Sequence, residues 1–369
     1  MSTKWDIGNI ITKRNLLTPH KTAMTYEDKT ITYRELNEGV NRVANFLQEK
    51  GFKKGDRISV LLRNCPEFFE IYFAAAKLGL VFVPLNIRLA GPEVQYQLHD
   101  SGARLLVFHD IFGEVVDSVR TQLNIEPDNF ACLESEGNDA MARPAWARLY
   151  HEVMRQSPMH EPRPKEPVYL EDPLAILYTS GVTGAPKGAI LSHEQTYFKV
   201  FQNIIYMDMR EDDVYLSQAP LFHSAGLFIS GTPCFCRGAT LIIRQRFDPV
   251  AFTEDIEKYR ATVIMAMTSM WRLILQTRKL DNVDVSSVRV VLGGGERTPP
   301  SMFDELAQHG LHIQQGFGQT ENSLMTVLSK EDIERKQGSV GLPGFFTHVW
   351  VIDEQGNVLP PNQIGRAHV

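Results

Sequence analysis

The chain has 369 residues, 43% of them hydrophobic, which is enough apolar material for a large core in two or more packed units. Its 38 basic and 44 acidic residues give a net charge of -6, which argues against a dedicated nucleic-acid binder, because such proteins carry a basic excess. The N-terminus has no apolar signal segment, and charged, glycine or proline residues interrupt every hydrophobic run. We therefore expect a soluble cytoplasmic protein without a transmembrane segment.

Strand and helix patterns alternate through the first part of the chain. A hairpin is expected from residues 23–26 and 30–33, and the next helix opens with a capping box of Thr32 and Glu35. Helices at 66–79 and 93–100 then alternate with strands at 57–62, 81–83 and 104–108. Residues 138–173 are rich in proline and lack periodicity, which is typical of an exposed connector. We predict a layered α/β subdomain over residues 1–170.

The second part repeats the alternation. Ser192 and Gln195 form another capping box, and a further helix is expected to start at Asp248-Pro249. Strands are expected at 214–217, 240–243, 262–265, 288–292 and 312–315. These elements predict a second α/β subdomain over residues 171–337. After residue 338 the segments become short and β-like, which indicates the beginning of a small β-barrel over residues 338–369.

One loop concentrates hydroxyls, glycines and a lysine directly after the apolar run 174–177. Glycines let backbone N–H groups approach an anion, hydroxyls add donors, and the lysine adds a full charge. A P-loop of the NTPases is excluded, because Pro186 precedes the lysine and Gly188 follows it, where that motif requires Gly-Lys-Ser/Thr. The residues expected to hold a polyphosphate are Thr179, Ser180, Gly181, Thr183, Gly184 and Lys187.

This loop resembles the Thr-Ser-Gly-Thr-Thr-Gly-x-Pro-Lys-Gly signature of the AMP-forming adenylate superfamily, and only Val182 departs from it. The superfamily comprises acyl-CoA synthetases, luciferases and peptide-synthetase adenylation domains. Four further segments match its motifs in the same order, which is the strongest support for the resemblance: PLFHSAG at 220–226, GGGE at 293–296, QGFGQTE at 315–321 and GSVGLPG at 338–344. The implied fold is the superfamily's layered α/β N-terminal domain.

The resemblance also implies roles for individual residues. Lys187, His223, Thr320 and Glu321 would be catalytic, with Glu321 as the Mg²⁺ ligand. The nucleotide would further contact Gly295, Glu296, Arg297, Gly316, Phe317, Gly318 and Gln319. The acyl group would contact His223, Gly226, Phe228, Thr268, Gly293, Gly318 and Ser323. This set is mostly apolar, which favours a fatty or aromatic monocarboxylic acid.

The implied activity is that of an ATP- and Mg²⁺-dependent acyl-CoA synthetase, which activates a carboxylic acid as acyl-AMP and transfers it to CoA. The chain ends at residue 369, before the family's Thr-Gly-Asp element, hinge and C-terminal lid domain. We therefore expect this chain to bind substrate and ATP with little or no turnover. Two alternatives stay open: a fatty acyl-AMP ligase or carrier-protein adenylation domain, and a non-catalytic ATP- or acyl-binding module. The resemblance also allows a homodimer.

Overall fold

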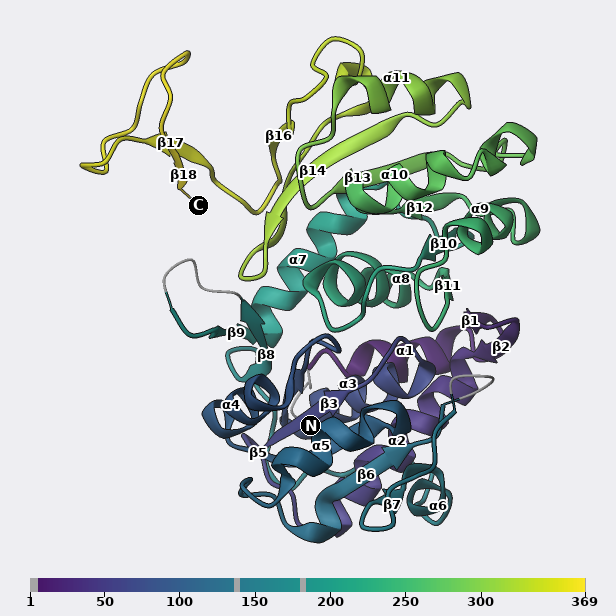
Figure 1. The fold of residues 1–369 in the computed structure, drawn as a ribbon, viewed down its shortest axis with the longest axis vertical. Helices are drawn as coiled ribbons and strands as arrows, with labels where there is room; N and C mark the ends of the chain where they lie inside the picture. Colours follow the sequence, from purple (N-terminus) through teal and green to yellow (C-terminus); the bar gives the residue numbers. More distant parts are fainter. Residues whose placement is uncertain (1–5, 136–139, 180–183, 369) are drawn as a thin grey trace.

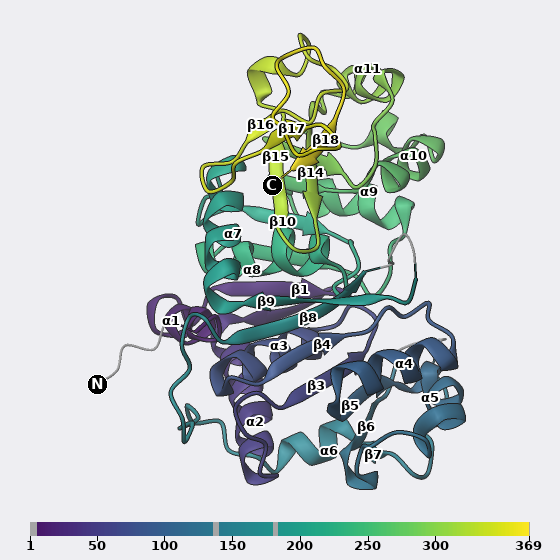
Figure 2. The same ribbon diagram turned by 90° about the vertical axis from the view of Figure 1, so that its left-hand side faces the viewer.

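The computed structural model describes residues 6–135, 140–179 and 184–368, and within these ranges the chain forms two large sheets and one small one (Figures 1 and 2). The described strands of the first sheet are ordered β7-β6-β5-β3-β4-β8-β9. All neighbours in it are parallel except β8 and β9. Its strands are β3 (Arg57–Leu61), β4 (Val81–Pro84), β5 (Ala103–His109), β6 (Phe130–Leu133), β7 (Arg148–Leu149), β8 (Pro173–Thr179) and β9 (Lys187–Ser192).

The second sheet has the order β16-β15-β14-β13-β12-β10-β11-β1-β2 among the described strands. The neighbouring strands β14, β13, β12, β10, β11 and β1 are parallel to one another. The pairs at the two edges, β16-β15-β14 and β1-β2, are antiparallel. Its strands are β1 (Thr22–Tyr26), β2 (Lys29–Thr32), β10 (Val214–Ser217), β11 (Thr240–Ile243), β12 (Val263–Met265), β13 (Val290–Gly294), β14 (Ile313–Gln319), β15 (Ser323–Val327) and β16 (Leu342–Pro343).

Helices cover both large sheets, and a small antiparallel pair follows the second one. The pair consists of β17 (Trp350–Ile352) and β18 (Arg366–His368), and it fits the beginning of a small barrel. The helices are α1 (Asn9–Leu17), α2 (Tyr33–Glu49), α3 (Pro66–Leu78), α4 (Gly91–Ser101), α5 (Gly113–Arg120), α6 (Tyr150–Arg155), α7 (His193–Tyr206), α8 (Thr232–Arg237), α9 (Pro249–Lys258), α10 (Thr268–Gln276) and α11 (Pro300–Gln308). No helix in the described ranges is long and apolar enough to cross a membrane.

Helix α3 joins the two halves of the molecule through a shared aromatic core. It is apolar on nearly every side, which is the pattern of a buried helix. Phe68 packs edge-on against Phe82 of the first sheet, with ring centroids 5.2 Å apart, and Phe69 packs against Phe235 of α8 at 4.9 Å. Because one continuous cluster of buried side chains spans both halves, the sheets are held in a fixed relation around it.

The layered α/β fold expected from the sequence is confirmed, and the sheets also show how the chain crosses between the two halves. Strands β1 and β2 lie within the expected first subdomain but pair into the second sheet, whereas β8 and β9 follow residue 170 and pair into the first. The point at which the chain passes from one sheet to the other therefore does not coincide with residue 170. The assignment of residues 1–170, 171–337 and 338–369 as subdomains stays a prediction.

The stretch 138–173 is more structured than expected. It contains β7 and α6, and Tyr150 and Met154 of α6 are buried. Three asparagines spaced by four residues along α2 also bind it: Asn45 donates hydrogen bonds to the carbonyls of Pro158 and His160, and Asn41 and Asn37 bond to Met159 and Glu161. The absence of hydrophobic periodicity was misleading here, because asparagine side chains of α2 hold this segment together with a few buried apolar residues.

Candidate active site

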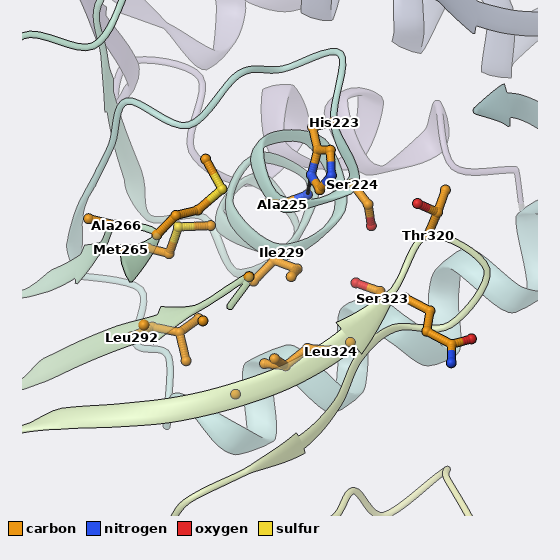
Figure 3. A pocket seen from close by; sticks show the side chains of 17 residues that line it. His223, Ser224, Ala225, Ile229, Met265, Ala266, Leu292, Thr320, Ser323 and Leu324 are labelled. Carbon is orange, nitrogen blue, oxygen red and sulfur yellow. Dashed lines mark hydrogen bonds between the residues drawn. The ribbon is translucent and has the colours of Figure 1, made fainter. Parts of the chain in front are cut away.

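A cavity of about 250 Å³ opens at the carboxyl ends of the parallel strands β10, β12, β13 and β14, which is where α/β sheets place their ligand sites (Figure 3). Strand ends and the loops that follow them supply its walls. The lining residues are His223, Ser224, Ala225, Ile229, Met265, Ala266, Met267, Leu292, Gly293, Gly294, Gly295, Gly316, Gly318, Gln319, Thr320, Ser323 and Leu324. We call this the front pocket.

Glycines of β13 and β14 line part of the front pocket, so the backbone itself forms the pocket surface there. Gly294 pairs with Gly316 across the two strands, and a Cβ atom on Gly294 would lie 2.6 Å from the carbonyl oxygen of Gly316. A Cβ on Gly318 would lie 2.0 Å from the carbonyl oxygen of Ser323. Larger residues are therefore sterically excluded at both positions, and the absence of side chains leaves a flat surface for a ligand.

His223 and Ser224 stand on one wall of the front pocket, and Ser323 lies on the opposite one (Figure 3). The backbone N–H of Ala225 donates to Nδ1 of His223 at 3.2 Å, which leaves the proton of the neutral imidazole on Nε2. The ring reaches solvent through the pocket mouth, yet desolvation by the surrounding protein lowers its pKa. Within the described ranges, the buried hydroxyls of Ser224 and Ser323 have no hydrogen-bond partner. Polar atoms of a ligand can satisfy both.

The turn between β14 and β15 carries Thr320 and Glu321. Thr320 lines the front pocket, whereas the exposed Glu321 lies just beyond it. Two side chains of α7 hold this turn: Gln195 Nε2 donates to the Glu321 carbonyl at 2.6 Å, and Lys199 Nζ donates to the same oxygen. Helix α7 starts directly after β9, so one helix links the turn to the strand that carries Lys187.

The polyphosphate loop is described only in part, because residues 180–183 lie outside the described ranges; Ser180, Gly181 and Thr183 are among them. Its flanks form the β8–β9 hairpin, in which Thr179 pairs with Lys187 and Tyr178 with Gly188. Lys187, Gly184 and Ala185 are exposed. In Figures 1 and 2 the β14–β15 turn projects toward this hairpin, although neither Thr179 nor Lys187 lines the front pocket.

Several residues expected at the site do not line the front pocket. Phe228 is fully buried beside Tyr72, and Gly226 lies against the backbone of Pro220. Thr268 is buried beneath the 294–298 loop, where its hydroxyl lies 2.9 Å from that of Thr298. Glu296, Arg297 and Phe317 do not line it either, and they are exposed or half-buried next to lining residues.

Other lining residues were not in the expected set. Ile229, Met265, Ala266, Leu292 and Leu324 line the front pocket although the motif comparison assigned them no role. Met265 ends the parallel strand β12 and pairs with Leu292 near the carboxyl end of β13, so the rule that ligands bind at the carboxyl ends of such strands could have identified both.

Comparisons with known proteins agree with this geometry. Residues 12–369 match the family described as AMP-binding enzyme, which is nearly the whole chain. The chain belongs to the AMP-binding enzyme family. Its expected similarity to the AMP-forming acyl-CoA synthetases is thereby confirmed.

The AMP-binding relatives include ligases that form CoA thioesters. The chain is 32% identical over 362 residues to a feruloyl-CoA synthase of Amycolatopsis sp, covering 97% of this chain and 68% of that enzyme. It is 30% identical over 351 residues to a crotonobetaine/carnitine–CoA ligase of Salmonella typhimurium, covering 94% and 67%. The inhibitor-bound N-terminal domain of FACL13 from Mycobacterium tuberculosis superimposes with a TM-score of 0.85 and 30% identity, covering 96% of this chain and 86% of that one.

Proposed function

We propose that this chain is the ATP- and acyl-binding part of an AMP-forming acyl-CoA synthetase. The observation that carries the proposal is the front pocket, which is lined by glycines of β13 and β14 and lies next to the turn that carries Glu321. Helix α7 links this turn to the hairpin that carries Lys187. The relatives' names support an acid–thiol ligase with CoA as acceptor over transfer to a carrier protein.

A carboxylate needs activation, because its charge repels nucleophiles and it has no good leaving group. In the proposed reaction, an oxygen of the acid attacks the α-phosphorus of ATP, the bond to the β-phosphate oxygen breaks, and pyrophosphate leaves. The thiol of CoA then attacks the acyl carbon, and AMP leaves. Catalysis of this kind depends on positioning the attacking oxygen in line with the leaving pyrophosphate and on neutralising the charge of the phosphates.

We assign the charged groups to the polyphosphate. Lys187 is an exposed ammonium without an ion pair among the described residues, so it can pair with a phosphate without first losing a partner. The flanking loop residues Thr179, Ser180, Gly181, Thr183 and Gly184 complete this proposed subsite. Thr320 adds a hydroxyl at the pocket edge.

The carboxylate of Glu321 suits Mg²⁺, which prefers oxygen ligands and is bound through one or two carboxylates together with substrate phosphates. Within the described ranges, no three His, Cys, Asp or Glu side chains gather to hold a metal alone. This donor set therefore fits an ion that arrives with ATP. When bound, Mg²⁺ would neutralise charge on the phosphate oxygens.

We assign the glycine-lined face to the nucleotide and the apolar wall to the acyl group. The proposed nucleotide residues are Gly295, Glu296, Arg297, Gly316, Phe317, Gly318, Gln319 and Thr320. The proposed acyl residues are His223, Gly226, Phe228, Thr268, Gly293, Gly318 and Ser323, of which His223, Gly293, Gly318 and Ser323 line the pocket. A cavity of about 250 Å³ walled by Ile229, Met265, Leu292 and Leu324 suits a compact aromatic monocarboxylic acid.

Binding of acyl sulfamoyl-adenosines, which are non-hydrolysable mimics of acyl-AMP, tests this function on the chain itself. Isothermal titration calorimetry should show that an aromatic acyl analogue binds more tightly than either adenosine or the free acid, because one molecule fills both parts of the site. Equal affinity for adenosine and for every acyl analogue would contradict an acyl subsite. Homodimerisation and a cytoplasmic location stay predictions.

A further inference from the structure

A second cavity, of about 340 Å³, lies between α7 and the β14–β15 turn, and we call it the rear cavity. Helix α7, the turn and the segment before β17 enclose it. Its lining residues are Gln195, Phe198, Lys199, Gln202, Asn322, Phe346, Thr347, His348 and Trp350. None of them lines the front pocket, so the rear cavity is a separate site.

Lys199 is a buried cation in the wall of the rear cavity. Its side chain is only 6% exposed, and within the described ranges its one hydrogen-bond acceptor is the neutral carbonyl of Glu321. No described carboxylate lies within ion-pair distance of it. Burying a charge is costly unless it is paired and fully hydrogen-bonded, so Lys199 has unused capacity for an anionic partner.

Two glutamine side chains next to Lys199 are already engaged. Gln195 donates to the Glu321 carbonyl, and Gln202 donates to the Leu324 carbonyl at 2.7 Å. Gln202 Oε1 also accepts hydrogen bonds from the Phe346 N–H at 3.0 Å and the Thr347 hydroxyl at 3.1 Å. These bonds hold the cavity walls in place, and Lys199 is the cationic group that the cavity offers to an anion.

Aromatic side chains form the apolar walls of the rear cavity. Phe198 and Phe346 contact each other, with ring centroids 5.2 Å apart, and Trp350 stacks on His348 at 5.6 Å. All three hydrophobic rings are partly exposed, at 46%, 43% and 43% respectively. Exposed aromatic surface beside a desolvated cation matches a ligand that has a flat apolar body and one negative group.

We propose that the rear cavity binds a small aromatic carboxylate, whose negative group pairs with Lys199 while its ring lies against Phe198, Phe346 and Trp350. This site goes beyond the proposed function, since the acyl group and ATP are assigned to the front pocket. Lys199 also donates to the Glu321 carbonyl, so in the proposed complex the same lysine contacts both the ligand and the turn.

Benzoate and its neutral analogue benzamide provide the direct test by isothermal titration calorimetry, with the front pocket saturated by an acyl sulfamoyl-adenosine, because a small aromatic acid is also the ligand proposed for that pocket. Benzoate should bind the full chain at least about tenfold more tightly than benzamide, because hydrogen bonds to charged groups exceed neutral ones by that order. Lys199→Gln keeps a donor for the Glu321 carbonyl but removes the charge, and it should weaken benzoate binding by about tenfold or more. Lys199→Arg should retain binding, and the exposed Lys13→Gln is the matched control.

A front-pocket variant separates this proposal from the proposed function. With the front pocket saturated in this way, His223→Ala should leave benzoate affinity unchanged, although it weakens binding of the acyl sulfamoyl-adenosine itself. Unchanged benzoate affinity in Lys199→Gln, loss of it in His223→Ala, or no benzoate binding to the wild type would each overturn the rear site. A melting curve of Lys199→Gln checks that the variant is folded.

Discussion

Gln195 Nε2 donates a hydrogen bond of 2.6 Å to the backbone carbonyl of Glu321, 126 positions further along the chain. Gln195 lies in the first turn of α7, and the residue before the helix, Ser192, ends β9. The bond therefore links the hairpin that carries Lys187 to the turn that carries Glu321. One helix therefore contacts two parts of the proposed ATP site.

Removing this link should loosen the Glu321 turn. Gln195→Ala is expected to weaken Mg²⁺-dependent ATP binding by about two- to tenfold, which corresponds to the loss of one hydrogen bond. Isothermal titration calorimetry with and without Mg²⁺ measures it. Gln95→Ala, which breaks an exposed bond between Gln95 and Gln122, is the matched control and should bind as the wild type. Equal affinities for both variants would show that the link has no role in binding.

Two glycine substitutions should differ in their effect on stability. Gly294→Ala places a Cβ 2.6 Å from the Gly316 carbonyl oxygen, where backbone cannot move aside, and it should destabilise the fold by about 1–3 kcal/mol. Gly184→Ala meets no atom of the described residues within 4 Å and should leave the free energy of unfolding unchanged. Urea denaturation of both variants makes the comparison. A Gly294→Ala variant with the same free energy of unfolding as the wild type would contradict the close approach of β13 and β14.

The unpartnered hydroxyl of Ser323 should favour ligand binding at the expense of stability. Ser323→Ala removes a buried polar group without a described partner, so it should leave the melting temperature unchanged or raise it. The same variant should weaken binding of an acyl sulfamoyl-adenosine. In contrast, Ser287→Ala removes a hydroxyl that donates to the Ala261 carbonyl at 2.9 Å, and it should lower stability without affecting binding. A Ser323→Ala variant with unchanged ligand affinity would exclude this hydroxyl from the site.

Two buried histidines should make the fold acid-sensitive. Burial lowers the pKa of His109 and of His193 to about 4, and in each ring Nδ1 accepts a backbone N–H, from Arg63 and Ile7 respectively. Between pH 6.5 and 4 the unfolded chain binds protons that the folded chain does not, so stability falls as pH is lowered.

Each histidine contributes up to about 1.4 kcal/mol per pH unit in that window. Thermal unfolding measured between pH 7 and 4.5 checks the slope. His193→Asn retains an acceptor for the Ile7 N–H and should flatten the dependence. A slope that is unaffected by this substitution would assign the acid sensitivity to other groups.

Local signals in the sequence predicted most elements, because they depend on neighbouring residues. The Thr32–Glu35 capping box forms as expected, with reciprocal hydrogen bonds of 3.2 and 2.8 Å, and α9 starts at Pro249 with Asp248 as its cap. Pairing of distant strands was not predictable in this way. The β1–β2 hairpin joins the second sheet because β1 pairs with β11, more than 200 residues away, and local periodicity does not encode that partner.

The second capping box shows where local reasoning fails. Ser192 accepts the Gln195 N–H at 3.1 Å as expected, but the Gln195 side chain does not return to the cap. It binds the Glu321 carbonyl instead. The phosphate and turn motifs could be identified from residue types, whereas the apolar wall and the buried Lys199 depend on tertiary packing.

The central claim is that the Lys187 hairpin and the Glu321 turn hold the same polyphosphate. A double-mutant cycle on Mg²⁺-dependent ATP affinity, with Lys187→Ala, Glu321→Gln and the double variant, tests it most directly; Lys13→Ala and Glu171→Gln, both exposed, are the controls. We predict that each single variant weakens binding and that the two effects are coupled by more than about 0.5 kcal/mol. Unchanged affinity in either single variant, or strict additivity of the two, would contradict the account.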